Sequence, residues 1–374
     1  MKYVFLFLFL LLPATTHAVW FDSSWDYRVK VEVVPSKVGS STAVTSFPVY
    51  NDCGGFPSTS WTNAQGDGDD IRVVESDEIT ETPFELVTFS TTSKKCELHF
   101  LADTMGTTST STFYIHYGNA AASAYASTTT YGSQAVWTDY KAVYHGEGNF
   151  NSATGLYNPT SQTNITYNGD GKLGQTTKYA SATSRAELGN PVGLQMTTVT
   201  NQVWARSTTS QASYRGLVAR HQNIGSILTL TNEILTYDWG GGGNRLTGVT
   251  INDGNWKLIH SQAVSGSANT AKVYINGEVK VTTTVTNSAS DSWYIGQISS
   301  SAGQNFAGEI DEIRIRNSIL SSAWIITEFN NQNATSTFFA IGAEEGEPVS
   351  GEATTIPSTG MSGGMVTGGG IMVR

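Results

Sequence analysis

The sequence is poor in the residues that several common functions require. Lys and Arg number 21 against 31 Asp and Glu, giving a formal net charge of −10, and charged residues make up only 14% of the chain. A nucleic-acid-binding protein needs a basic surface that displaces counterions from phosphates, so this class is excluded. The two cysteines do not form a Cys-x-x-Cys pair, which argues against the usual cysteine-rich zinc sites.

Long apolar runs are also absent after the N-terminus, and the N-terminal run itself predicts a secretory signal peptide over residues 1–18. Lys2 supplies a positive charge, residues 4–12 are apolar, and Ala18 ends the segment on a small residue. The alternative is an uncleaved membrane anchor, but the run is shorter than the roughly 20 residues that a membrane span needs. We expect a protein that is secreted or at the cell surface, with no membrane span after cleavage.

The cysteine content fits an exported chain. Cys53 and Cys96 are the only cysteines. Exported proteins are oxidised, so two cysteines most simply form one disulfide. We therefore predict a Cys53–Cys96 bond.

The pattern of polar and apolar residues predicts an all-β protein. Residues 27–33 and 83–89 alternate as half-buried strands do, and Asn276-Gly277 is a strong hairpin signal. The one helix that we expect covers residues 322–330, with Ser321 or Ser322 as its N-cap. We predict two β-sandwich modules, residues 19–120 and 136–345, separated by a linker over 121–135 and followed by a disordered tail over 346–374.

Ordered motifs in the first module resemble a known family. They are residues 25–28 (WDYR), 67–73 (DGDDIRV), 83–86 (PFEL) and 113–120 (FYIHYGNA). In this order they resemble the DUF2341 domain, a module of unknown function found on exported prokaryotic proteins. The resemblance implies no particular activity.

The second module resembles the laminin-G-like jelly roll of the concanavalin A-like lectin/glucanase superfamily. The segments that carry the resemblance are residues 253–259 (DGNWKLI), 273–277 (VYING), 294–296 (YIG) and 306–315 (FAGEIDEIRI). The resemblance implies a concanavalin A-like jelly roll. Members of this superfamily bind sugars or protein partners, some hold calcium, and others are glycosidases, so the fold alone leaves the function open.

A glycosidase needs two carboxylates at the scissile bond, and the best candidates are Glu309, Asp311 and Glu312. On a regular strand Glu309 and Asp311 point to one face and Glu312 to the other. Glucanases of the superfamily carry a further Glu two or three positions after the Asp, where this chain has Ile313 and Arg314. We therefore assign no catalytic residue, and Asp311 can instead bond a nearby turn.

Calcium is a further expectation, because turn-rich acidic loops supply the oxygen ligands that it takes. Glu147 occupies an early loop of the jelly roll and Asp311 a late strand, and the first and last strands of such folds often meet. We expect these two carboxylates to share a structural calcium ion, unless both are ordinary surface acids. The histidines of the jelly roll, by contrast, show no metal-like spacing.

Exposed tryptophan is the side chain on which a sugar ring stacks. Trp204, Trp239 and Trp293 are candidates, although most tryptophans in a sandwich belong to the core. Trp239 precedes the glycine run 240–243 and is therefore the preferred ligand-binding residue.

The leading hypothesis from the sequence is a secreted, non-catalytic binding or adhesion protein whose jelly roll recognises a glycan or a cell-surface protein. The alternatives are a glycoside hydrolase of the concanavalin A-like superfamily and a structural cell-surface spacer.

Overall fold

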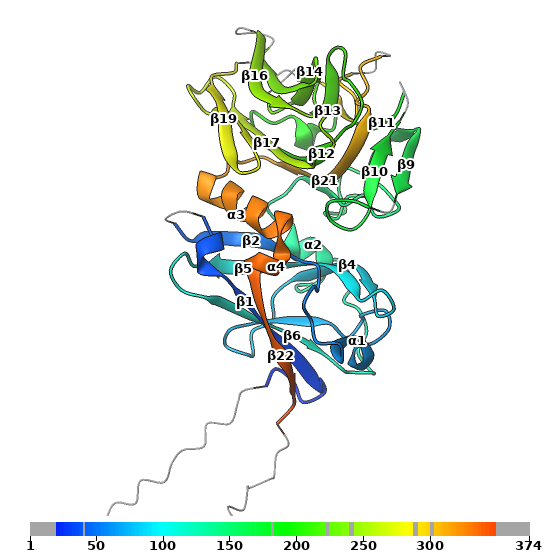
Figure 1. Cartoon of the computed structure of the whole chain (residues 1–374), viewed down its shortest axis with the longest axis vertical. Coiled ribbons are helices and arrows are strands. Elements are labelled where there is room, and N and C mark those ends of the chain that lie inside the picture. The colour runs from blue at the N-terminus through cyan, green and yellow to red at the C-terminus, as the bar shows by residue number, and fades with distance from the viewer. Residues whose placement is uncertain are drawn as a thin grey trace, which may run out of the picture.

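The computed structural model describes residues 20–39, 42–168, 170–180, 183–221, 224–238, 243–286, 291–299 and 303–348. The described part of the chain is mostly β, as predicted, with 44% of its residues in strands and 10% in helices. Figure 1 shows two β modules, with the long helix α3 between them. Residues 1–18, where we predict a signal peptide, lie outside the described residues, as does the predicted tail from residue 349 onward.

The first module, module 1, is a sandwich of two antiparallel sheets. The larger sheet has the order β22-β1-β6-β3 and the smaller β2-β5-β4. Their strands are β1 (Tyr27–Val33), β2 (Val44–Asn51), β3 (Arg72–Glu75), β4 (Phe84–Ser90), β5 (Lys95–Met105), β6 (Ser111–Tyr117) and β22 (Phe339–Gly346). Short helices η1 (Pro35–Lys37), α1 (Ser60–Asn63) and α2 (Ser133–Val136) connect them. The apolar face of each strand meets the other sheet, as where Phe100 packs on Phe113 with ring centroids 4.8 Å apart.

The second module is the jelly roll. One sheet has the order β19-β18-β17-β12-β21-β10-β9 with β7 also beside β21, and the other β16-β15-β14-β13-β20-β11-β8. The strands are β7 (Ala142–Tyr144), β8 (Ser161–Thr163), β9 (Ile165–Asn168), β10 (Thr176–Tyr179), β11 (Arg185–Gly189), β12 (Thr198–Arg206), β13 (Arg215–Ala219), β14 (Ile227–Leu230), β15 (Glu233–Asp238), β16 (Gly243–Thr250), β17 (Lys257–Val264), β18 (Ala271–Ile275), β19 (Glu278–Thr283), β20 (Trp293–Ile295) and β21 (Gly308–Arg316), with η2 (Val192–Leu194) before β12. Asn276 and Gly277 both have positive φ between β18 and β19, so the predicted hairpin is confirmed.

The chain returns to module 1 after the jelly roll. The helix that we predicted is present as α3 (Ser322–Asn333), and the side chain of its N-cap Ser321 accepts a hydrogen bond from the Trp324 amide. After α4 (Thr335–Phe338), β22 pairs with β1, and Tyr27 lies opposite Gly346.

We assigned residues 136–345 to the jelly roll and residue 346 to the tail, but β22 (Phe339–Gly346) belongs to module 1. The jelly roll is inserted between β6 and β22, because β22 completes the far side of the sheet that β1 and β6 begin. A sequence pattern shows that a strand exists but not which distant strand it pairs with.

The predicted disulfide is confirmed. Cys53, just after β2, is bonded to Cys96 at the start of β5, with a Cα–Cα distance of 5.5 Å. The disulfide fixes the beginning of β5, and the residues of β5 that follow Cys96 face the jelly roll. Among the described residues, no helix is both long enough and apolar enough to span a membrane.

Candidate functional site

The two modules meet across the outer face of the β12–β21 sheet, with α3 between them. Asn331 of α3 forms two hydrogen bonds with the backbone of Tyr50 in β2, both 2.8 Å long. Glu328 of α3 reaches the jelly roll, where its carboxylate accepts from Arg314 at 2.8 Å and contacts His260 at 2.7 Å. The helix is therefore bonded to both modules.

A group of four ionisable side chains lies buried at this interface, and we call it the inter-module cluster. Glu97 and His99 come from β5 of module 1, His145 follows β7, and Glu312 lies on β21. One ligand atom from each lies within 4.8 Å of the others. All four are at most 6% exposed. The cluster exists only because the modules are joined, since each supplies two of its residues.

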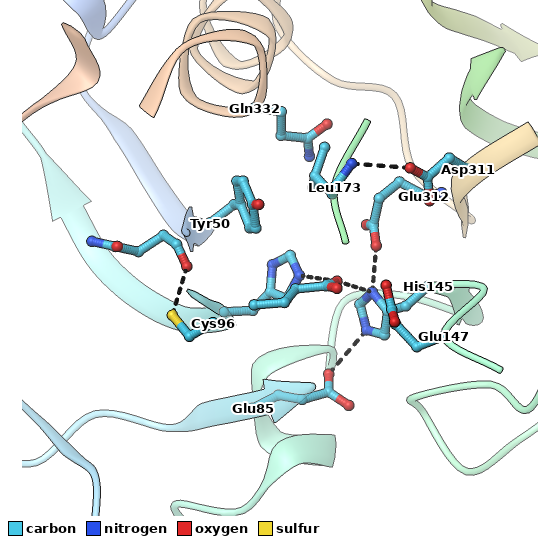
Figure 2. A network of polar contacts seen from close by, with 12 residues as sticks. Tyr50, Glu85, Cys96, His145, Glu147, Leu173, Asp311, Glu312 and Gln332 are labelled. Atoms are coloured by element: carbon cyan, nitrogen blue, oxygen red, sulfur yellow. Dashed lines mark hydrogen bonds and ion pairs between the residues drawn. The ribbon is translucent and has the colours of Figure 1, made fainter. Parts of the chain in front are cut away.

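The contacts inside the cluster are short and specific (Figure 2). His145 Nδ1 donates to Glu312 Oε1 at 2.5 Å and lies 3.5 Å from Glu97 Oε1. His99 Nε2 donates to Glu97 Oε1 at 3.3 Å, and the two imidazole rings stack with centroids 4.9 Å apart. Glu97 Oε1 therefore lies near a nitrogen of each ring.

A second group of side chains holds the cluster in place. Glu85 of β4 accepts from His145 Nε2 at 3.2 Å and from the indole N–H of Trp137. Arg314 donates to Glu312 Oε2 from Nη2 at 2.9 Å and from Nε at 3.1 Å. These contacts hold Nε2 of His145 and Oε2 of Glu312. They leave Nδ1 of His145 and Oε1 of Glu312 facing the centre of the cluster.

A β-bulge brings Glu312 into the cluster. Trp204 lies opposite Asp311 but Gln202 lies opposite Arg314, so β21 has one residue more than β12 in this interval. Glu312 has a φ of 47°. We expected Glu312 to point away from Asp311, and that expectation is wrong, because the extra residue breaks the strict alternation. Both carboxylates face the module interface, as Figure 2 shows.

Burial and neighbouring charges set the protonation of the cluster. Burial works to lower the pKa of His145, but the carboxylates of Glu312 and Glu85 outweigh it and raise the pKa well above its usual value. Burial works to raise the pKa of Glu312, and His145 and Arg314 hold it below its usual value instead. Burial raises the pKa of Glu97 and lowers the pKa of His99. The surroundings therefore favour the charged forms of Glu312 and His145 and the neutral forms of Glu97 and His99.

The cluster also contains polar atoms with few or no partners. Within the described part of the chain, His99 Nδ1 has no hydrogen-bond partner, and Glu97 Oε2 has none other than the carboxylate of Glu147. The neighbour of Glu97 on this side is the carboxylate of Glu147, and a side chain at Gly174 would collide with both carboxylates. Two carboxylates in such proximity must share a proton or bind a cation.

The residues that we predicted to bind calcium lie beside the cluster. Asp311 Oδ2 accepts from the backbone amides of Lys172 at 2.7 Å and Leu173 at 3.0 Å, and Glu147 accepts from the amide of Gln175. Asp311 thus bonds a nearby turn, the alternative role that the sequence left open. Calcium at Glu147 and Asp311 stays a prediction.

The tryptophan candidates fall into two groups. Trp239 lies outside the described residues, so its role in ligand binding stays a prediction. Trp204 and Trp293 are 0% and 1% exposed and belong to buried clusters of apolar side chains. Neither offers a ring face to a ligand.

A second candidate site is an open cavity of about 410 Å³ in the jelly roll, at the ends of β10 and β12 and the start of β21. We call it the rim cavity. Its charged lining residues are Lys178, Arg206 and Glu309, and Glu309 lies opposite both others across the strands. Arg206 pairs with Glu309, and its guanidinium lies 4.7 Å from the ring centre of the half-buried Trp256. The sequence indicated Glu309 as a candidate carboxylate, but no sequence pattern indicated that Arg206 or Lys178 would line a cavity.

Comparison with known proteins supports the fold of the second module. Residues 174–326 match the Laminin_G_3 family model, described as the concanavalin A-like lectin/glucanases superfamily. The match does not reach module 1, so its resemblance to the DUF2341 domain stays a prediction. No curated protein matches the sequence.

Three solved structures illustrate the structural likeness. Domain 4 of AbnA, an extracellular arabinanase from Geobacillus stearothermophilus solved with arabinotriose, is 22% identical, with 51% of this chain and 98% of that chain covered and a TM-score of 0.39. The binding domain of Paraclostridial Mosquitocidal Protein 1 is 14% identical, with 51% of this chain and 52% of that chain covered and a TM-score of 0.43. The receptor binding domain of botulinum neurotoxin type G is 14% identical, with 52% of this chain and 52% of that chain covered and a TM-score of 0.39. This chain thus covers about half of each toxin domain. At these identities and scores the likeness supports no conclusion about the ligand or the function of this chain.

Proposed function

We propose that this chain is an exported, non-catalytic binding protein whose jelly roll binds a carbohydrate in the rim cavity. The observation that carries the proposal is the row of Lys178, Glu309 and Arg206 along one wall of an open polar cavity. Export rests on the predicted signal peptide, with which the Cys53–Cys96 disulfide is compatible.

The chemistry of the cavity suits a polyhydroxylated ligand. Binding sites for small molecules place a few polar groups where they fix the orientation of the ligand. Arg206 and Lys178 donate hydrogen bonds and Glu309 accepts them, and hydrogen bonds to charged groups are the stronger ones. Trp256 supports Arg206 from behind, which limits the conformational freedom that Arg206 loses on binding.

Hydrolysis of the same ligand is disfavoured by the arrangement of the carboxylates. A glycosidase of the usual kind needs an acid and a second carboxylate on either side of the bond that breaks. Among the described residues that line the rim cavity, Glu309 is the one carboxylate, and it is paired with Arg206. Asp311, two residues later, is 1% exposed and bonded to the turn at Lys172 and Leu173.

A glycan array followed by calorimetry tests the proposal. We expect the purified chain to bind at least one family of polysaccharides, and Arg206→Ala to weaken that binding about tenfold or more, which corresponds to about 1.4 kcal/mol. Glu309→Gln should weaken it as well, because it removes a charged acceptor.

Arg215→Ala is the matched control, because Arg215 is half-buried on the opposite sheet and should not change the affinity. An empty array would contradict the proposal and favour the structural-spacer alternative. A glycan that binds wild type, Arg206→Ala and Glu309→Gln equally well would place the binding site elsewhere on the chain.

A further inference from the structure

We propose that the inter-module cluster is a binding site for a divalent transition-metal ion such as Zn²⁺, held by Glu97, His99, His145 and Glu312. Two ligands come from β5 of module 1 and two from the jelly roll, so a bound ion would join the modules directly. This site is separate from the rim cavity and independent of the function proposed for it.

The distances within the cluster are close to those of a four-coordinate site. Tetrahedral zinc with bonds of about 2.0–2.1 Å places its ligand atoms about 3.3 Å apart. Glu97 Oε1 lies 3.3 Å from His99 Nε2 and 3.5 Å from His145 Nδ1. The pair of His145 Nδ1 and Glu312 Oε1 is closer, at 2.5 Å, because a proton joins them. The ion would replace that proton and move the two atoms apart, as metals do when they bind to protonated ligands.

The surroundings of the four ligands match those of metal sites. A histidine that binds a metal commonly donates its other N–H to a carboxylate, which fixes the ring. Glu85 accepts from His145 Nε2 in this way at 3.2 Å. Arg314 occupies Oε2 of Glu312 and leaves Oε1 for the ion.

The Oε2 oxygen of Glu97 marks a point beside the cluster that a proton or a cation must occupy. Glu97 is 1% exposed, and its Oε2 faces the carboxylate of Glu147, with which it forms a hydrogen bond when one of the two is protonated. A buried carboxylate in this position is costly unless a proton or a cation balances it. A divalent ion bound at Glu97 would displace the proton that Glu97 and Glu147 otherwise share.

A surface groove runs beside this point, separated from the Glu97 carboxylate by Gly174. Glu147, Gly174 and Gln175 form one side of a groove of about 590 Å³ between the modules, and Ser90 and Lys94 lie on the other. Gly174 has no side chain to cover the carboxylates of Glu97 and Glu147, and its φ of 58° favours glycine there.

The donor set distinguishes a transition metal from calcium. Calcium takes six to eight oxygen ligands, whereas imidazole nitrogen suits zinc, copper, iron and nickel. With two imidazoles and two carboxylates, the cluster provides half of its ligand atoms as nitrogen.

The test is metal binding to the purified full chain after treatment with a chelator. We expect one equivalent of Zn²⁺ per chain by calorimetry and elemental analysis, and a melting temperature that rises with free Zn²⁺ because the ion binds only the folded form. Co²⁺ at the same site should give the visible absorption bands of a four-coordinate ion. Calcium should not displace the bound Zn²⁺, because two of the four ligand atoms are nitrogens.

Glu97→Gln is the decisive variant, because it keeps the shape of a buried side chain and removes a charged ligand. We expect it to fold with an unchanged or higher melting temperature in chelator, and to bind Zn²⁺ at least about tenfold more weakly. His221→Gln, at a half-exposed histidine remote from the cluster, is the matched control and should bind Zn²⁺ as wild type does.

Two results would overturn the proposal. One is a wild-type chain with no stoichiometric Zn²⁺ binding and no change in melting temperature. The other is a Glu97→Gln chain that retains the full zinc response, which would place the ion elsewhere. A response to Ca²⁺ that is lost in Glu147→Gln, without one to Zn²⁺, would instead support the calcium site expected at Glu147 and Asp311.

Discussion

His116 illustrates how single residues of module 1 combine charge and burial. It lies on β6 directly opposite Arg28 of β1 and Arg72 of β3. Its ring is 0% exposed and contacts the rings of Trp20 and Phe21, and within the described residues neither ring nitrogen has a hydrogen-bond partner. Burial, assisted by the positive charge of Arg28, lowers the pKa of His116 to about 3.

This pKa predicts a loss of stability in acid. In the unfolded chain His116 has its ordinary pKa of about 6.5 and binds a proton below that pH. In the folded chain it stays unprotonated until the pH falls to about 3. The free energy of unfolding should therefore fall as the pH drops through this window, by up to about 1.4 kcal/mol per pH unit from this group alone. His116→Phe should remove that part of the pH dependence, measured as the difference between urea unfolding curves of the two chains from pH 7 to pH 4. Parallel pH profiles for wild type and variant would show that His116 does not titrate in this way.

The cluster shows which residues could be found from the sequence and which could not. Cys53 and Cys96 were paired correctly because two cysteines leave one choice. Nothing in the sequence indicated that His145 lies beside His99, because His99 is 46 positions earlier and belongs to a different module. Glu312 was assigned to the wrong face, because a bulge at one residue is invisible to a rule based on alternation.

The motifs that resemble the DUF2341 domain contact one another in the fold. Trp25 donates from its indole to the backbone oxygen of Asp70 at 2.6 Å, and Asp70 accepts from the amide of Gly118 at 2.7 Å. Arg72 stacks on Trp25, with its guanidinium 5.2 Å from the ring centre. These contacts give a physical reason why three separated motifs occur together in one chain.

At the scale of elements, α3 is the part that ties the modules together. Its residue Glu328 is fully buried and accepts from Arg314 and contacts His260, both on strands of the jelly roll. The sequence predicted this helix and its N-cap, but nothing in the sequence marked Glu328 as an ion-pair partner of residues in the jelly roll.

Glu328→Ala should be strongly destabilising. Removing one partner of a buried ion pair leaves the other charge uncompensated, and such changes cost about 3–5 kcal/mol. We expect the free energy of unfolding from denaturant titration to fall by this amount. Glu278→Ala is the control, because Glu278 is 72% exposed and pairs with Lys280 at the surface, where little change is expected. Equal effects of the two substitutions would mean that Glu328 contributes no more than a surface pair.

At the scale of the whole molecule, the jelly roll is an insertion in module 1. Module 1 is complete only when β22 pairs with β1, after the jelly roll and α3 have formed. The start of β1 and the end of β22 therefore lie side by side, and Glu347 donates its amide to the carbonyl of Asp26. This arrangement required pairing between strands about 300 positions apart, which no local pattern encodes.

The shared interface predicts that the two modules unfold together. The cluster and α3 both make contacts with the two modules, so separating the modules would expose buried charges. We expect a single calorimetric transition whose van't Hoff and calorimetric enthalpies agree. Two resolved transitions, each matching one module, would contradict this coupling.

The central claim is that the jelly roll binds a carbohydrate without cleaving it. The most direct measurement is the release of reducing ends from the polysaccharide that the glycan array selects, followed in the same samples in which its binding to the full chain is measured. The account predicts saturable binding that Arg206→Ala weakens, with no reducing ends above those of the polysaccharide alone. Release of reducing ends by the wild-type chain that disappears in Glu309→Gln would contradict the account and identify the chain as a glycoside hydrolase.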